Sequence, residues 1–247
     1  MEEKSLNGVN PNIENIKKAL VVVAHPDDID FGCAGTVAWL TDSGVNVSYC
    51  LVTSGDAGGD NDGLTTQQRA GQRELEQTDA AKVVGVEKIH FLKQPDGRIE
   101  SDLELREKIT RVIRNEKPDL VITQSPQRRY DRIYASHPDH LATGEATFCA
   151  VYPDSRNPNA YPHLLDEKCL PHNVPNVWIM ADEHPDTFID ITEVFERKLD
   201  ALFSHESQIS DQEAVREMMK EWTGGMAKLG GLKKDRYAEG FRFVNTI

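Results

Sequence analysis

Two short runs of histidine and aspartate are the residues of this sequence best suited to carry chemistry. The run His25-Pro26-Asp27-Asp28 follows directly on the apolar residues VVVA, and a second run, HPDH, occupies positions 137–140. Imidazole nitrogens and carboxylate oxygens are zinc ligands, and catalytic zinc sites use three protein ligands and a water molecule. In both runs a proline follows the first histidine and favours extended geometry at that histidine. The two runs therefore predict a metal site, provided that the fold brings them together.

Within the first run, His25 and Asp28 are three residues apart across a turn, so both can meet one ion. Asp27 points in a different direction and is left beside the attacking water, where it can act as a general base. One histidine of the second run, His137 or His140, completes the set. Zn²⁺ is the metal that this set predicts, and iron(II) also suits two histidines and one carboxylate.

Simpler structural roles compete with this interpretation. Asp28 or Asp30 could cap the following helix, because carboxylates favour the positive end of the helix dipole. Capping is the favoured role for either aspartate alone, but it does not explain two His/Asp runs after two strands. A third HPD, at 184–186, precedes a strand-like segment instead of following one. We therefore expect this third motif at the opposite edge of the sheet and not among the ligands.

Apolar segments and helical patterns alternate along the chain and must position the two runs. Strands are predicted at residues 18–24, 45–53, 88–92, 118–124, 174–181 and 188–191. Helical patterns fall at residues 31–44, 65–84, 103–117, 137–152 and 193–205. We predict a capping box at Ser101 and Glu104 and a helix cap at Thr192. This alternation predicts an α/β protein with a parallel sheet, helices on both faces and a less regular C-terminal third.

The two runs are expected at one edge of that sheet. The first follows strand 18–24, and the second ends the loop after strand 118–124. In open α/β sheets, functional groups gather at the carboxyl ends of the strands. The predicted topology therefore places both His/Asp runs where a site would form.

Composition narrows the class of protein. The net charge of −13 argues against a nucleic-acid or anionic-membrane binder, because no basic surface of the needed size is available. The polar start lacks the apolar core of a signal peptide, and no apolar run approaches the ~20 residues that span a membrane. We expect one cytoplasmic domain over residues 1–247, with a polar extension at 1–17. Trp178 and Trp222 are predicted to be core or interface aromatics. Buried free thiols are expected at Cys33, Cys50, Cys149 and Cys169.

The sequence resembles the LmbE/PIG-L family of deacetylases. The resemblance depends on AHPDD at 24–28, followed by a glycine-containing helix, and on HPDH at 137–140. Weaker motifs occur in the family's order along nearly the whole chain: Arg73-x-x-Glu76 before VGV, FLKQPDG, PDLVIT, FIDIT before a lysine-bearing helix, and HESQ. The resemblance implies a Rossmann-like three-layer fold and a zinc-dependent enzyme. The reaction it implies is removal of acetyl groups from N-acetylglucosamine-type sugars.

Carried over residue by residue, the resemblance implies that His25, Asp28 and His140 bind the metal. It implies that Asp27 is the general base. This division agrees with the chemistry, because zinc lowers the pKa of its water to ~7 and a nearby carboxylate can take the remaining proton.

Four further residues receive roles from the resemblance. His137 would stabilise the oxyanion or act as general acid, and Asp139 would orient His137. Loss of one oxyanion contact typically costs ~10²–10³ in rate. Arg73 and Asp96 match positions that bind sugar hydroxyls in relatives.

The sequence departs from the family pattern at three places. Asp30 stands where the family usually has a glutamate, which alters a contact behind the metal. Some relatives carry a tyrosine two residues before HPDH, whereas here Tyr134 lies one position earlier. Asp56 and Asp60 replace glutamates that relatives often carry in the glycine-rich loop. We expect that loop, at residues 54–64, to be a lid beside the site, and a plain solvated turn is the alternative.

Several functions remain open. The leading hypothesis is hydrolysis of an acetamido sugar or conjugate, and a first alternative is an amidase acting on a sugar–thiol conjugate. A catalytically idle sugar-binding relative is a different class, against which the intact Asp27 argues. A nucleotide-binding module is disfavoured, because no G-x-G-x-x-G follows the first strand. Relatives are often oligomeric, so the resemblance also implies a homo-oligomer.

Overall fold

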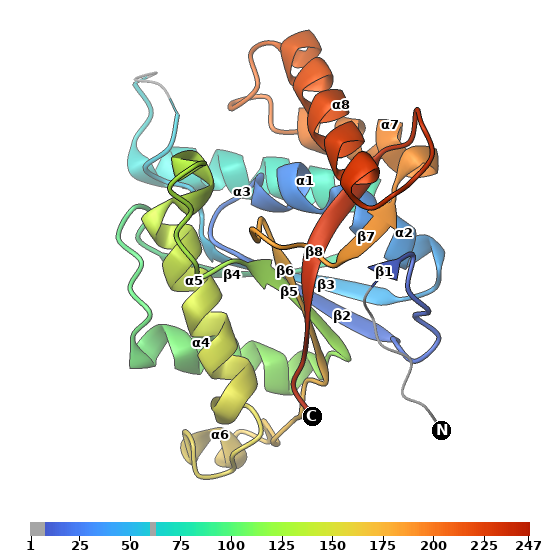
Figure 1. The fold of residues 1–247 in the computed structure, drawn as a ribbon. Helices are drawn as coiled ribbons and strands as arrows, with labels where there is room; N and C mark the ends of the chain where they lie inside the picture. The colour runs from blue at the N-terminus through green and yellow to red at the C-terminus, as the bar shows by residue number, and fades with distance from the viewer. Residues whose placement is uncertain (1–7, 60–62) are drawn as a thin grey trace.

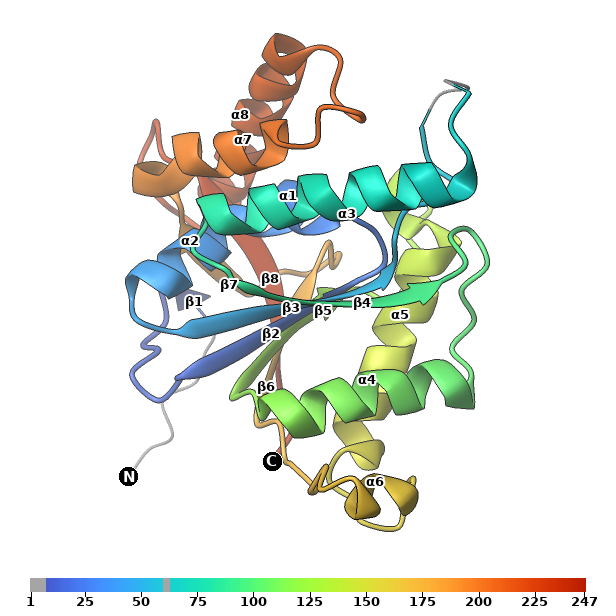
Figure 2. The same cartoon turned by 180° about the vertical axis from the view of Figure 1, so that it is seen from behind.

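The structure, a computed structural model, describes residues 8–59 and 63–247. Within these residues one sheet of eight strands has the order β1-β7-β8-β6-β5-β2-β3-β4 (Figures 1 and 2). Neighbouring strands of the sheet run parallel to one another, except that β8 is antiparallel to both β6 and β7. The strands are β1 Gly8–Val9, β2 Lys18–Val23, β3 Asn46–Thr53, β4 Lys88–Gln94, β5 Leu120–Gln124, β6 Asn176–Met180, β7 Thr187–Asp190 and β8 Ala238–Asn245. The predicted mostly parallel sheet is confirmed.

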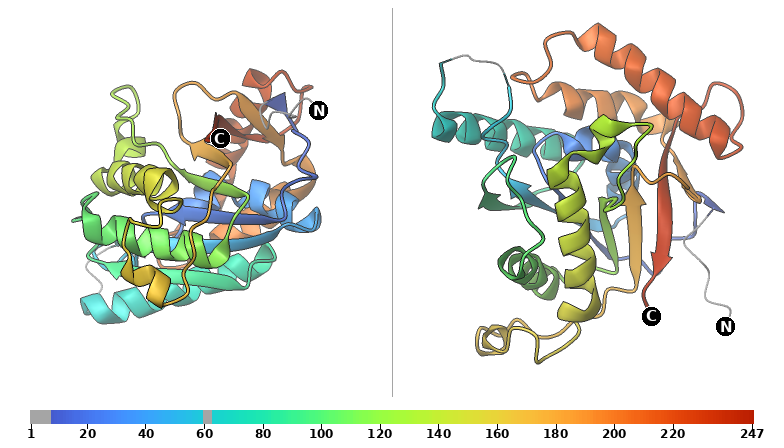
Figure 3. Two further views of the ribbon diagram at one scale, coloured as in Figure 1. Left: turned by 90° about the horizontal axis from the view of Figure 1, so that it is seen from below. Right: turned by 60° about the vertical axis from the view of Figure 1, so that its left-hand side comes forward.

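Helices cover both faces of the sheet, as Figure 3 shows. One face carries α1 Asp28–Gly32, α2 Ala34–Asp42, α3 Thr66–Val83, α7 Phe195–Phe203 and α8 Gln212–Leu229. The other carries α4 Leu103–Glu116, α5 Pro138–Cys149 and α6 His163–Asp166. Alternate residues of β2 enter two separate apolar clusters, with Val21 on one face and Val22 on the other. The three-layer α/β prediction is therefore confirmed, and it explains why β2 is apolar throughout.

The end of β5 is fixed closely against β2 and α5. The side chain of Gln124 accepts a 2.9 Å hydrogen bond from the backbone N–H of Ala24, the residue before His25. On α5, a Cβ at Gly144 would lie 2.4 Å from the Gln124 carbonyl oxygen, so only glycine allows this approach. The first turn of α5 carries the second His/Asp run, so both runs are set against one strand end.

The C-terminal third is more regular than the sequence predicts. It contains the long helix α8 and the strand β8, which lies between β6 and β7 (Figure 1). Met180 of β6 and Thr187 of β7 both lie opposite Phe241 of β8, so β7 begins at the level where β6 ends. The third HPD motif lies between them, at the carboxyl edge. Its prediction at the opposite edge is wrong because β7 is displaced along β8.

Two predicted helix caps are also wrong. The predicted N-cap of α4 is Ser101, but the N-cap in the structure is Asp102, whose side chain accepts from the N–H of Leu105. Thr192 begins a 3₁₀ turn and donates to Asp190, while α7 starts after Val194 without a side-chain cap. Of the predicted buried thiols, Cys149 alone is partly exposed. Among the described residues, no helix is both long enough and apolar enough to cross a membrane.

Candidate active site

Three imidazoles meet at the carboxyl edge of the sheet. His25 follows β2, while His137 and His140 stand at the start of α5. Their ring centroids are 5.1 Å apart for His25 and His137, 5.2 Å for His25 and His140, and 5.4 Å for the last pair. The structure therefore brings together two segments that are far apart in the sequence, as the two runs predict.

Carboxylates surround this histidine cluster. Asp28 lies between two rings, with one oxygen 3.3 Å from Nδ1 of His25 and the other 3.0 Å from Nε2 of His140. Nε2 of His25 also lies 3.1 Å from Asp96 and 3.2 Å from Asp139. Burial opposes protonation of His25, but the charge of Asp28 and the bonds to the other carboxylates raise its pKa to about 12. Burial likewise opposes the charge on Asp28, and His140 and His25 hold its pKa well below the ordinary value.

These residues fit a divalent cation. Ligand atoms of His25, His137 and His140 all lie within 4.8 Å of one another, and so do those of His25, Asp96 and Asp139. Three carboxylates around one imidazole form a locally anionic site that favours positive charge, whether a proton or a metal ion. Asp28 contacts both His25 and His140, but neither of the two converging groups contains it, so the predicted ligand set of His25, Asp28 and His140 stays a prediction.

Asp27 lies beside the cluster in a strained conformation. Its φ of 82° is left-handed, which costs a residue with a Cβ roughly 1–2 kcal/mol. Two residues of α3 hold it there: Gln77 accepts from its backbone N–H at 2.9 Å, and Arg73 donates to its carboxylate at 2.9 Å. Burial raises the pKa of Asp27 to about 6, against the opposing charge of Arg73. The carboxylate of Asp27 is thus placed beside the histidine cluster without forming part of either converging set.

Arg73 is buried beneath Asp27. Besides Asp27, its guanidinium donates to the carbonyl oxygens of Pro26 at 2.8 Å and Gly55 at 3.1 Å, and the residue is only 4% exposed. A Cβ at Gly55 would lie 2.3 Å from the guanidinium, and φ there is +65°, so glycine is required on both counts. These contacts position Asp27. The predicted contact of Arg73 with sugar hydroxyls stays a prediction.

A buried chain of polar groups extends behind Asp27. The sequence points to Asp30 and, through the motif HESQ, to His205, but sequence reasoning did not find Gln77, which joins them to Asp27. The side-chain oxygen of Gln77 accepts from the backbone N–H of Asp27, and its amide nitrogen donates to Oδ2 of Asp30 at 2.9 Å. The same Oδ2 of Asp30 lies 2.8 Å from Nε2 of His205. The last three residues are fully buried. The one available signal was spacing, because Gln77 lies four residues after Arg73 and so on the same face of a helix.

We expect replacement of Gln77 by leucine to lower kcat by up to about 100-fold with little change in KM, because Asp27 loses the bond that fixes its strained backbone. Metal content should stay at the wild-type level. Steady-state kinetics and elemental analysis check this, with the exposed Gln72→Leu on the same helix as control. Equal loss in both variants would show that Gln77 has no special role.

Asp139 makes contacts that differ from those the sequence suggests, whereas the predicted contact of Asp96 with sugar hydroxyls stays a prediction. The Asp139 carboxylate accepts from the backbone N–H groups of Gly97 and Ile99, and it faces His25. His137 instead contacts the backbone of Asp139: Nδ1 of His137 accepts from the N–H of Asp139 at 3.2 Å. The predicted orientation of His137 by that carboxylate is therefore not what the geometry gives.

The Asp96 loop is tied to the glycine-rich loop. Asp96 accepts from the N–H of Ala57 at 3.0 Å, and its own N–H donates to Asp56 at 3.2 Å. The predicted lid is described only in part, because Asp60 lies outside the described residues. The side chain of Tyr134 lies outside them as well.

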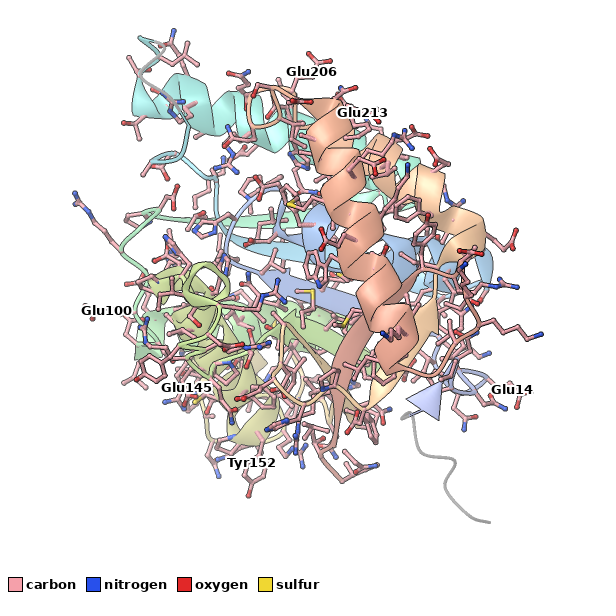
Figure 4. All side chains as sticks on the ribbon, turned by 45° about the horizontal axis from the view of Figure 1, so that its top comes forward. Glu14, Glu100, Glu145, Tyr152, Glu206 and Glu213 are labelled. Atoms are coloured by element: carbon pink, nitrogen blue, oxygen red, sulfur yellow. The ribbon has the colours of Figure 1, made fainter. Side chains whose placement is uncertain are left out.

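Acidic side chains are spread widely over the surface. Figure 4 labels Glu100 and Glu145 on one side of the molecule, Glu206 and Glu213 beside α8, and Glu14 on a third side. This distribution agrees with the large negative net charge.

The fold and the site define a known class of enzyme. The family model PIG-L, GlcNAc-PI de-N-acetylase, matches residues 20–151, a segment that contains both His/Asp runs. The chain belongs to the PIG-L/LmbE family, and the relatives named as deacetylases indicate an enzyme that hydrolyses amide bonds.

Individual relatives agree with this assignment. The chain is 34% identical over 244 residues to a diacetylchitobiose deacetylase of Thermococcus kodakarensis, covering 97% of this chain and 87% of that protein. It is 32% identical over 197 residues to a probable N-acetyl-alpha-D-glucosaminyl L-malate deacetylase 2 of Bacillus cereus, with coverage of 78% and 84%. The structure of N,N'-diacetylchitobiose deacetylase from Pyrococcus horikoshii matches with a TM-score of 0.87 at 32% identity, covering 94% of this chain and 85% of that one.

Proposed function

We propose that the protein is a zinc-dependent N-deacetylase that removes the acetyl group from an N-acetylglucosamine-type sugar or conjugate. One observation carries the proposal: Asp28 lies between His25 and His140, with Asp27 held beside them. The sugar chemistry is supported by relatives named as deacetylases of acetylated amino sugars. Iron(II) is the second candidate metal, because the same ligand types suit it.

In the mechanism we propose, His25, Asp28 and His140 hold the metal. When bound, the metal supplies Lewis acidity that activates water and polarises the amide carbonyl. Asp27 takes the proton from the attacking water, and its pKa of about 6 keeps it able to accept one near neutral pH. Burial lowers the pKa of His137, and its Nδ1 accepts from the backbone N–H of Asp139, so Nε2 of the neutral ring can donate a hydrogen bond to the oxyanion. We propose that Arg73 and Asp96 orient the sugar from the side of the glycine-rich loop.

Metal content should separate the two histidines of the second run. We expect His140→Ala to lose most of its bound metal, because Asp28 and His140 face one another at 3.0 Å. His137→Ala should keep the metal and lose turnover. Elemental analysis of protein purified without chelators checks both variants. Metal loss in both variants would favour the three-imidazole set, in which His137 is also a ligand, over the set that contains Asp28.

The test of the function is release of a free amine from a panel of N-acetylated glycosides, with acetate measured in parallel. Release of a larger acid from a sugar–thiol conjugate, without acetate, would favour the amidase alternative. Retained metal without turnover of any amide would favour an idle sugar-binding relative.

Other properties follow as proposals. We propose that residues 1–247 form one domain, located in the cytoplasm. The ligand is a small acetamido sugar, and nucleic acids and membranes are not partners. The protein forms a homo-oligomer. Size-exclusion chromatography with light scattering tests the last point.

A further inference from the structure

A cavity of about 410 Å³ opens directly beside the histidine cluster. Asp28 and His140 form part of its wall, and Gln124, Met180 and Gly240 place it at the ends of β5, β6 and β8. We call it the α8 cavity, because α8 lies over it. Its volume is within the range of roughly 300–1,000 Å³ that small-molecule sites occupy.

The wall of the α8 cavity is largely apolar. On α8, Met218, Trp222 and Met226 line it at intervals of four residues, which places them on one helix face. The guanidinium of Arg132 lies 5.6 Å from the centre of the Trp222 ring. Methionine side chains adapt to irregular apolar ligands. Further apolar wall residues include Phe31, Met180 and Pro185. Polar side chains such as Gln124, Arg129 and Asp182 also line the wall, but the apolar face is wide enough to bury an alkyl chain.

A second hollow lies on the other side of the cluster, and most of its wall residues carry polar side chains. This groove of about 630 Å³ follows β3 and β4, and we call it the β4 groove. Ser54, Asp56, Glu74, Lys93 and Gln94 are among its wall residues. Asp56 accepts from the backbone N–H of Asp96, and the Asp96 carboxylate faces His25, so the groove adjoins the cluster. Since β2 lies between β5 and β3 in the sheet, the two hollows flank the cluster from opposite sides.

An amide substrate has two parts that leave the reacting carbon in opposite directions. The amine part of an amino sugar carries the hydroxyls and suits the polar β4 groove. The acyl part then points into the α8 cavity, which is far larger and more apolar than an acetyl methyl group needs. A glycosidic substituent belongs to the amine part and starts from the polar side.

We propose that the enzyme also hydrolyses N-acyl amino sugars with longer alkyl chains, and that the α8 cavity binds the acyl chain. This inference rests on the function proposed above. Water adds its oxygen to the acyl carbon, the C–N bond breaks and the sugar nitrogen takes the proton. The products are a carboxylic acid and a free amino sugar.

The first test compares kcat/KM for N-acetyl-, N-butanoyl-, N-hexanoyl- and N-octanoylglucosamine. We expect kcat/KM to rise by up to about fourfold for each methylene group that the cavity buries. A parallel series with N-acetyl held constant and alkyl glycosides of growing length should stay flat. A flat acyl series, or a rise in the glycoside series alone, would overturn the proposal.

Two matched variants on α8 locate the effect. Met218 and Leu229 are both exposed, at 46% and 60%, but only Met218 lines the cavity. Met218→Glu should lower the octanoyl-to-acetyl ratio of kcat/KM by about tenfold or more, because the chain then meets a charge. Leu229→Glu should leave the ratio unchanged. Equal ratios in the two variants would contradict a binding role for this cavity.

Direct binding separates this proposal from the proposed function. If no amide is hydrolysed, the deacetylase assignment fails, and calorimetry with the same compounds decides on the cavity. Tighter binding of N-octanoylglucosamine than of N-acetylglucosamine, lost in Met218→Glu and kept in Leu229→Glu, would support it. Equal binding of both compounds would refute it.

Discussion

Replacing Asp27 by asparagine is expected to lower kcat by roughly 10²–10⁴-fold while the bound metal stays at the wild-type level. Asparagine has nearly the same shape and can still accept a hydrogen bond from Arg73, which now lies 2.9 Å from the carboxylate. It cannot take a proton from water, so the proposed base is lost while its position is kept. Steady-state kinetics and elemental analysis of the same preparation measure the two quantities.

The matched control for this variant is Asp28→Asn. Asp28 contacts both His25 and His140, so its substitution should remove metal and activity together. Similar metal loss in Asp27→Asn would mean that Asp27 is itself a ligand, and the proposed division between base and ligand would fail. Retention of near-normal kcat in Asp27→Asn would mean that another group accepts the proton.

The parts of the site that sequence could predict are those encoded locally. His25 and Asp28 belong to one run after a buried strand, and His140 belongs to a run at the start of a helix. Parallel strands bring their carboxyl ends to one edge, so these two local patterns suffice to predict convergence. The structure brings His25 and His140 to a ring distance of 5.2 Å, as that argument requires.

Contacts set by distant packing could not be predicted in this way. Asp139 looks from its sequence like a partner of its neighbour His137, but its carboxylate is taken by the backbone of Gly97 and Ile99. The strand β8 has the sequence AEGFRFVN, in which Glu239 and Gly240 come before most of the apolar residues, so its pattern does not predict an eight-residue strand. Its insertion between β6 and β7 brings Glu239 to a helix 204 residues earlier in the chain.

That long-range contact belongs to a buried ion pair that holds the junction between α1 and α2. The Lys198 ammonium lies 2.8 Å from Glu239 and donates to the carbonyls of Asp30 and Phe31, at the end of α1. The Glu239 carboxylate accepts from two backbone N–H groups in the first turn of α2. Both side chains are buried, at 0% and 3% exposure. The pair therefore joins α1, which begins at Asp28, to α2 and to the sheet.

We expect Lys198→Met to reduce the free energy of unfolding by about 3–5 kcal/mol, because it leaves the Glu239 carboxylate buried without its partner charge. The exposed pair of Lys220 and Glu217 provides the control, and Lys220→Met should change stability by no more than about 0.5 kcal/mol. Urea unfolding of the three proteins measures the difference. Adding Glu239→Gln to Lys198→Met should recover part of the loss, because the double variant contains no unpaired charge. If the double variant is less stable than Lys198→Met alone, hydrogen bonds from Glu239 to α2, and not the ion pair, dominate the stability of this junction.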